Sequence, residues 1–152
     1  MRGKWRIVVV VLVVAAVGLT AVQVVRAVRG DDAEAQRHRE IEREHQVAYH
    51  LRGVGSAIEP VQITYSGPDG SDETAGAPAL APEWDESVTV EPGVYQLHLL
   101  AGAPVTNRDF RLTCTIEVDG VEVARDAVTN DCEVWFALED LPKVRASATP
   151  SP

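Results

Sequence analysis

The chain has 152 residues, 45% of them apolar, which fits one globular domain with additional segments. Its formal net charge of −9 is unevenly spread: residues 1–30 carry five basic and no acidic residues, whereas residues 31–152 carry 9 basic and 23 acidic residues. Nucleic acids and anionic lipid headgroups are bound by basic surfaces, so the acidic larger part disfavours both as partners.

The first predicted element is a membrane-spanning helix over residues 7–25 (IVVVVLVVAAVGLTAVQVV), after a short basic N-terminus over residues 1–6. The segment carries no charge, and a helix of this length is about 28 Å long, close to the hydrocarbon thickness of a bilayer. A buried helix of this length would need a larger core than the chain supplies, and a cleaved signal peptide has a shorter apolar run with small residues at its cleavage site. An uncleaved anchor is the favoured interpretation, and a cleaved one is the alternative.

Basic residues flank the span on both sides, so the positive-inside rule does not orient it. The N-terminal position of the span, the two cysteines and the β-rich remainder are typical of a signal anchor whose larger part is translocated. We therefore expect a single-pass protein of the cell membrane, with a cytoplasmic N-terminus and an extracytoplasmic C-terminal domain.

Residues 26–45 form a charged segment that we interpret as a helical stalk, with a disordered linker as the alternative. Its Glu, Arg, Gln and Ala residues are helix formers, and opposite charges recur three residues apart, as at Arg37 and Glu40. His38 and His45 lie seven residues apart, without a set of carboxylates or cysteines at ligand spacing. We therefore expect both histidines to be solvated.

From residue 46 to 142 the apolar period changes to two, which indicates β-strands. The stretch 67–82, rich in Gly, Pro, Ala and Asp, is interpreted as a long surface loop. About seven short strands with no helical pattern between them predict an all-β fold, an immunoglobulin-like antiparallel β-sandwich, with an up-and-down barrel as the alternative. Residues 143–152 are expected to be a flexible C-terminal tail. The predicted strands cover residues 47–52, 61–66, 84–91, 94–100, 112–118, 121–126 and 132–138.

Asp119 and Gly120, flanked by alternating apolar residues, predict a β-hairpin with a type I′ turn. This register separates an apolar from a polar face on both strands, and a slip of one residue would turn the apolar set to solvent. The pairs that it places opposite one another are Val118 and Val121, Ile116 and Val123, and Cys114 and Arg125.

The only two cysteines, Cys114 and Cys132, take core-facing positions on strands joined by a short connection. A metal site or a thioredoxin-like redox pair is disfavoured, because the segment contains neither a CxxC motif nor a histidine. In an oxidising compartment a disulfide is favoured over two free thiols. Closing a loop of about 19 residues would contribute about 3 kcal/mol to stability.

Two side chains are candidates for a partner surface. Trp135 takes the opposite parity to the core-facing Phe136, and His98 the opposite parity to Leu97 and Leu99, so we expect both candidates to be exposed. The sequence contains no nucleophile elbow, zinc-protease motif or phosphate-binding loop. We therefore expect no catalytic residues, no metal ligands, no cofactor and no enzymatic activity.

Five segments together carry a family resemblance: the span 7–25, the strand pair VAYHLRGVG (47–55) and VQITYSG (61–67), WDESVTV (84–90), and LTCTIEVDGVEVARD (112–126) followed by Cys132. On these segments the chain resembles the MmpS family of small mycobacterial membrane proteins, which have a short basic N-terminus, one membrane span and an extracytoplasmic β-sandwich.

The resemblance implies a non-enzymatic accessory of an MmpL transporter, a proton-driven pump of the resistance-nodulation-division (RND) class that moves lipids or siderophores to the cell envelope. The charged stalk and the Pro-Ser-Thr tail over residues 146–152 depart from the pattern expected of that family. The resemblance therefore does not identify the cognate pump or establish that there is one. The alternative function is an envelope-anchored module that binds a small apolar ligand without a pump.

Overall fold

The computed structural model describes residues 34–103 and 109–148, and those from Arg37 onward belong to one compact unit. The predicted membrane span 7–25, residues 26–33 of the predicted stalk and residues 149–152 of the predicted tail lie outside the described residues. Within the described ranges, no helix is long and apolar enough to cross a membrane.

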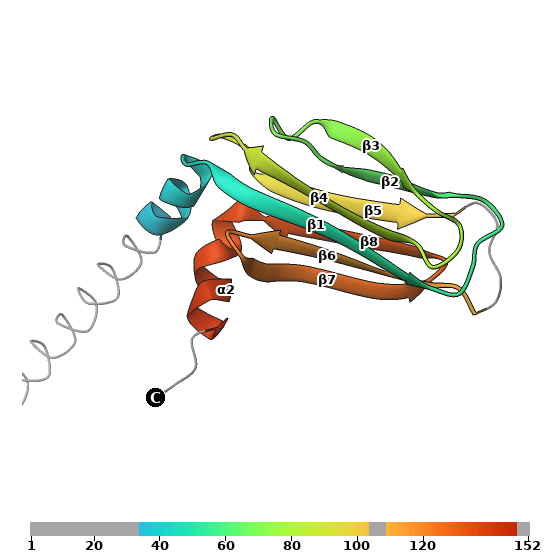
Figure 1. Cartoon of the computed structure of the whole chain (residues 1–152). Coiled ribbons are helices and arrows are strands. Elements are labelled where there is room, and N and C mark those ends of the chain that lie inside the picture. Colours follow the sequence, from blue (N-terminus) through green and yellow to red (C-terminus); the bar gives the residue numbers. More distant parts are fainter. Residues whose placement is uncertain (1–33, 104–108, 149–152) are drawn as a thin grey trace, which may run out of the picture. The chain divides into compact units, whose positions relative to one another are not determined.

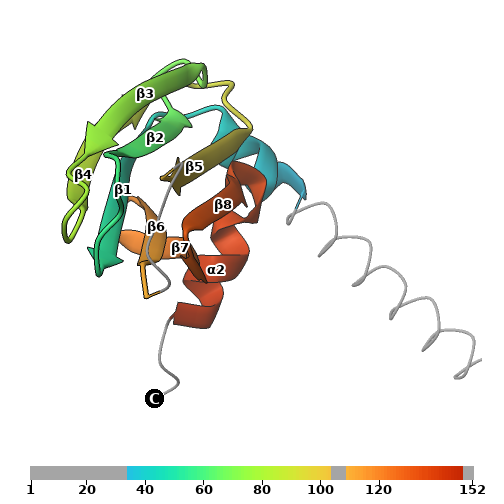
Figure 2. The ribbon, with the colours of Figure 1, turned by 90° about the vertical axis from the view of Figure 1, so that its right-hand side faces the viewer.

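In the described part of the chain, eight strands form two antiparallel four-stranded sheets, which confirms the predicted all-β sandwich with one strand more than expected. The sheets have the orders β4-β1-β6-β7 and β3-β2-β5-β8, and they face each other as two layers (Figures 1 and 2). The elements are β1 (His45–Val54), β2 (Val61–Ser66), β3 (Asp72–Ala77), β4 (Glu83–Val90), β5 (Gln96–Gly102), β6 (Arg111–Val118), β7 (Val121–Thr129), β8 (Asp131–Ala137), the 3-10 turn η1 (Leu138–Asp140) and helix α2 (Leu141–Ala148).

The core lies between the two sheets and follows from the alternation of apolar residues along the strands. In β6, Leu112, Cys114, Ile116 and Val118 are fully buried, while the residues between them are only partly buried. Burying an aliphatic side chain of this size stabilises a fold by about 1.5–3 kcal/mol, so one such strand anchors its sheet firmly. The fully buried side chains of the facing sheet include Val61, Leu97 and Leu99.

Cys114 of β6 and Cys132 of β8 form the predicted disulfide. Their Cα atoms are 5.8 Å apart, and the two cysteines are 0% and 3% exposed. Since β6 and β8 belong to different sheets, the disulfide joins the two layers of the sandwich.

The prediction of a continuous surface loop over residues 67–82 is wrong, because β3 lies within it and pairs with β2. Ala75 and Ala77 lie opposite Ile63 and Val61 in this pairing and pack against the core. Alanine, glycine and aspartate have low β propensity, so the strand depends on its tertiary partners.

The predicted turn at Asp119 and Gly120 is present, with φ angles of 52° and 77°. The predicted register holds only next to the turn, because β7 contains a bulge in which Val123 is the extra residue. The observed pairs are Val118 with Val121, Glu117 with Glu122, Ile116 with Ala124, and Cys114 with Asp126, in place of the predicted Ile116 with Val123 and Cys114 with Arg125.

Within the compact unit, the segments that precede and follow the strands pack on the sandwich. Residues 34–41 are helical, as predicted for the stalk, but Ile41 is only 7% exposed and its carbonyl accepts a hydrogen bond from the Gly93 N–H at 2.8 Å. Residues 143–148, predicted as part of a flexible tail, belong to α2, which buried Leu138 and Leu141 anchor to the core. Figure 1 shows α2 beneath one end of the strands.

An ionic group at this end, which we call the Asp119 cluster, contains Glu40, Arg43, His45, Asp119 and Arg145. His45 is fully buried, so the expectation that it is solvated is wrong, whereas His38 is exposed and pairs with Glu42 at 3.2 Å. The His45 Nδ1 lies 3.0 Å from the Asp119 carboxylate and its Nε2 lies 2.6 Å from the Glu40 carbonyl oxygen. Both ring nitrogens of His45 therefore lie within hydrogen-bond distance of an oxygen acceptor.

The arginines of the cluster bind Asp119 as well. Arg43 Nη2 lies 3.1 Å and Arg145 Nη2 lies 2.5 Å from Asp119 Oδ2. Burial raises the pKa of Asp119, but the hydrogen bonds from His45 and the Gln46 N–H and the charges of His45 and Arg43 outweigh it, so the pKa lies below its usual range. The cluster thus ties residues 40–45, the β6-β7 turn and α2 together.

Candidate functional site

The outer faces of the two sheets differ in chemistry. On the β4-β1-β6-β7 sheet, charged side chains pair with one another: His50 with Asp85 at 2.6 Å, Arg52 with Asp85 at 2.9 Å, and Arg125 with Glu122 at 3.9 Å. The hydrogen bond from His50, assisted by Arg52 and opposed by burial, holds the pKa of Asp85 below its usual range. This face is internally neutralised, as is usual for a solvated surface.

On the β3-β2-β5-β8 sheet, a row of side chains crosses the outer face in the order Asp72, Ser66, His98 and Trp135. Here the predicted exposure of His98 is wrong, because the residue is 7% exposed. The Ser66 hydroxyl accepts a hydrogen bond from the His98 N–H at 3.0 Å and lies 2.8 Å from His98 Nδ1. His98 Nε2 lies 3.3 Å from Asp72 Oδ1. The ring of His98 is therefore held on both of its nitrogens.

Trp135 is exposed as predicted, with 48% of its surface accessible. Its ring packs on His98 with centroids 4.8 Å apart and planes inclined by 33°. Its Nε1–H donates a hydrogen bond to Glu133 Oε1 at 2.5 Å. The structure thus brings the two predicted partner-surface residues together, with the buried histidine supporting the exposed tryptophan.

Ser66, His98 and Asp72 are the residue types of a catalytic triad, but their arrangement is structural. Ser66 is 0% exposed and its hydroxyl already contacts two groups of His98, so a substrate carbonyl has no path to it. The serine also faces Nδ1, whereas in serine hydrolases it faces Nε2. The row is best described as the support for Trp135.

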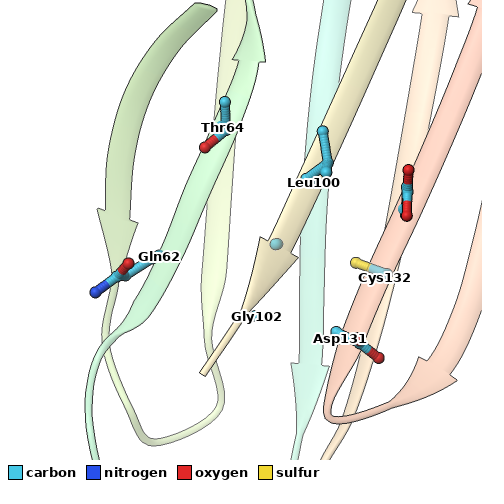
Figure 3. Close-up of a pocket in the computed structure, with 8 residues that line it drawn as sticks. Gln62, Thr64, Leu100, Gly102, Asp131 and Cys132 are labelled. Carbon is cyan, nitrogen blue, oxygen red and sulfur yellow. The ribbon is translucent and has the colours of Figure 1, made fainter. Parts of the chain in front are cut away.

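Next to this row lies a shallow hollow of about 290 Å³ that crosses β2, β5 and β8 (Figure 3). It forms where Gly102, which has no side chain, lies between Gln62 and Asp131 on the neighbouring strands. The residues that line it are Gln62, Thr64, Leu100, Ala101, Gly102, Asp131, Cys132 and Glu133. Glu133 belongs both to the hollow and to the hydrogen bond with Trp135, so the two features are continuous.

The exposed charged side chains on the strands of this face are all acidic. The strands β2, β3, β5 and β8, all of whose residues are described, contain no lysine or arginine. Asp72, Asp131 and Glu133 all lie exposed on it. We call this surface, with Trp135 and the hollow, the acidic face.

Sequence reasoning missed Ser66, Asp72 and the hollow. Ser66 and His98 are 32 residues apart, and only the pairing of β2 with β5 brings them together. Asp72 starts β3, the strand that low propensity concealed. Within residues 34–103 and 109–148, no three His, Cys, Asp or Glu side chains lie close enough together to hold a metal ion.

The geometry of the acidic face is therefore the basis for a function, since comparison with known proteins adds none: no protein-family model matches the chain, and no curated protein matches it at a significant level.

Proposed function

We propose that the protein is a membrane-anchored, extracytoplasmic interaction module that assists an MmpL-type transporter of the RND class in exporting a lipid or siderophore. The observation that carries the proposal is the difference between the two outer faces. On the β4-β1-β6-β7 face, charged side chains pair with one another. The β3-β2-β5-β8 face presents a half-exposed tryptophan beside a hollow.

Trp135 has the properties of an interface anchor. Tryptophan is enriched among the residues that dominate binding energy at protein interfaces. Its contacts with His98 and Glu133 fix the ring before a partner arrives, so little side-chain entropy remains to be lost on binding. A rigid aromatic residue on a rigid sheet therefore favours protein recognition over catalysis.

The location is proposed from the sequence and supported by the disulfide. An N-terminal apolar segment over residues 7–25 is long enough to anchor the chain, and disulfides persist mainly in oxidising compartments outside the cytoplasm. We propose that the domain is immunoglobulin-like in one respect: two facing antiparallel sheets are joined by a disulfide. Each sheet has four strands here, so the likeness does not extend to the strand arrangement. The resemblance to the MmpS family supplies the transporter as the partner.

Photo-crosslinking from the two outer faces tests the interaction. A benzoylphenylalanine at Gln62, on the acidic face, should form an adduct in intact cells, and mass spectrometry should identify its partner as an RND-class transporter. The matched control is the same probe at Ser87, which is exposed on the outer face of β4. Equal adduct yields from both positions, or adducts that lack a transporter, would refute the proposal. Bound lipid in native mass spectrometry, without a transporter adduct, would favour the carrier function.

Thiol labelling tests the topology. Ser87→Cys adds an exposed thiol, whereas the native cysteines are paired and buried. A membrane-impermeant maleimide should label this variant in intact cells. Labelling that appears only after lysis would place the domain in the cytoplasm.

A further inference from the structure

We infer that the acidic face receives a basic segment of the partner protein, with an arginine or lysine side chain seated in the hollow beside Trp135. The inference rests on the proposed function and deepens it to the chemistry of the partner. Three observations carry it: the unpaired charge of the face, the lining of the hollow and the position of Trp135.

Among the described residues, no lysine or arginine neutralises the carboxylates of the acidic face. Within the described part of the chain, Asp131 and Glu133 form no ion pair with a lysine or arginine, and Asp72, whose side chain is 73% exposed, contacts only the ring of His98. A neutral or acidic partner would bury these carboxylates without compensation, which is unfavourable. A basic segment would supply the missing charge and orient the approach of the two proteins.

The lining of the hollow matches a long side chain with a cationic end. Leu100 and Gly102 offer an apolar floor for a methylene stem, while Asp131 and Glu133 stand at the β8 side to accept hydrogen bonds from an ammonium or guanidinium group. The hollow is shallow and open, so it would seat one side chain of a larger partner and would not enclose a small molecule as typical ligand sites do.

Trp135 adds a second contact for a cation. A guanidinium stacked over an exposed indole is attracted by the ring quadrupole, and Arg pairs with Trp more favourably than with other rings. Glu133 lies between the hollow and this indole. Two basic residues close together in an extended segment could therefore occupy the hollow and the ring at once.

Charge also argues against other occupants. An anionic headgroup or an acidic peptide would be repelled by the three carboxylates. A second copy of the chain, joined through the same face in a two-fold dimer, would place acidic residues against acidic residues.

Peptide titration of the full-length protein in nanodiscs of zwitterionic lipid tests the inference. The probes are the peptide acetyl-Ala-Arg-Leu-Arg-Ala-amide and its matched analogue with citrulline in place of arginine, which has nearly the same shape but no charge. We expect the arginine peptide to bind at least about tenfold more tightly, and its affinity to fall severalfold between 0.15 M and 1 M NaCl, as the Debye length drops from about 8 Å to about 3 Å.

The variants locate the site. The double variant D131N/E133Q and, separately, Trp135→Ala should each weaken binding of the arginine peptide about tenfold or more. The matched control E117Q/E122Q removes two carboxylates from the opposite outer face, and it should change the affinity less than about twofold. Thermal unfolding of each variant shows that a lost affinity does not reflect a lost fold.

Each outcome has a separate meaning. Equal binding of the two peptides, no binding of either, or equal losses in the control variant would overturn the inference. A transporter adduct at Gln62 without preference for the arginine peptide would refute only the inference that the partner segment is basic. Preference for the arginine peptide without a transporter adduct would refute the transporter as the partner, but it would support the inference that the acidic face binds a basic segment.

Discussion

Asp119→Asn should destabilise the protein by about 2–3 kcal/mol, because it removes one charge from the point where three parts of the described chain meet. Asparagine tolerates the positive φ of 52° at this turn position, so the substitution tests the charge and not the turn. The main loss is at His45, whose fully buried ring would lose its contact with the carboxylate 3.0 Å from Nδ1.

The magnitude follows from the exposure of each partner. Removing one member of a buried ion pair costs about 3–5 kcal/mol. Asp119 is 24% exposed and asparagine keeps an oxygen that can accept a hydrogen bond, which reduces this figure. Arg43 and Arg145 have side chains 44% and 34% exposed, so water compensates much of their loss and they add little.

Thermal unfolding of the full-length chain in detergent micelles, followed by circular dichroism at pH 7, measures the effect. At about 4 °C per kcal/mol, the melting temperature should fall by about 8–12 °C. Glu59→Gln, which neutralises another exposed carboxylate, is the control and should leave it unchanged. A fall of less than about 4 °C in the Asn variant would refute the view that this carboxylate holds the cluster.

The same residue gives a pH dependence with a defined sign. The pKa of Asp119 is lower in the folded than in the unfolded state, so its contribution is complete above the unfolded value near 4 and is lost as pH falls through the folded value. The difference in melting temperature between wild type and Asp119→Asn should therefore shrink as the pH is lowered from 5 toward 2. A difference that stays constant over this range would show that ionisation of Asp119 is not the cause.

Three further changes should lower the free energy of unfolding. Reduction of the Cys114–Cys132 disulfide, which spans 18 positions, should cost about 3 kcal/mol, and an unchanged unfolding midpoint in urea would show that the cross-link does not stabilise the fold. Gly53→Ala should cost about 1–3 kcal/mol, because its Cβ would lie 2.2 Å from a proline ring, whereas Gly76→Ala, with its nearest atom at 3.7 Å, should cost less than about 1 kcal/mol; equal costs would exclude the clash as the cause. Tyr49→Phe should cost about 1–2 kcal/mol, since it leaves a buried backbone carbonyl without its hydrogen bond of 2.9 Å, and a neutral result in urea unfolding would show that this bond is dispensable.

The sandwich could be predicted because most of its strands carry strong local signals. Val47, Tyr49 and Leu51 alternate with less buried residues in β1, and β-branched and aromatic side chains favour strands. β3 has no such signal, since its sequence DETAGA consists of poor strand formers, and it exists because β2 offers it a partner. The missed strand carries Asp72, so the acidic face could not be assembled from the sequence.

The ends of the domain were misread for a related reason. His45 sits in a charged run, and its burial depends on Asp119, 74 residues further along the chain. By contrast, α2 did leave a signal: Leu138, Leu141 and Val144 recur every three residues, which is a helical spacing. Local periodicity is thus enough for elements that carry their own apolar stripe, and it fails where a distant ion pair decides the packing.

The bulge in β7 affects how the domain can meet its own copies. Its extra residue turns Asp126 toward the side of Cys114, and there the carboxylate accepts a hydrogen bond from the Glu133 N–H at 3.2 Å. Because β8 is the last strand of its sheet, this N–H would otherwise be open to a strand from another molecule, the usual route to domain swapping and aggregation. Through Asp126, the bulge therefore occupies one edge donor of β8 and makes this part of the edge less available to a strand from another molecule.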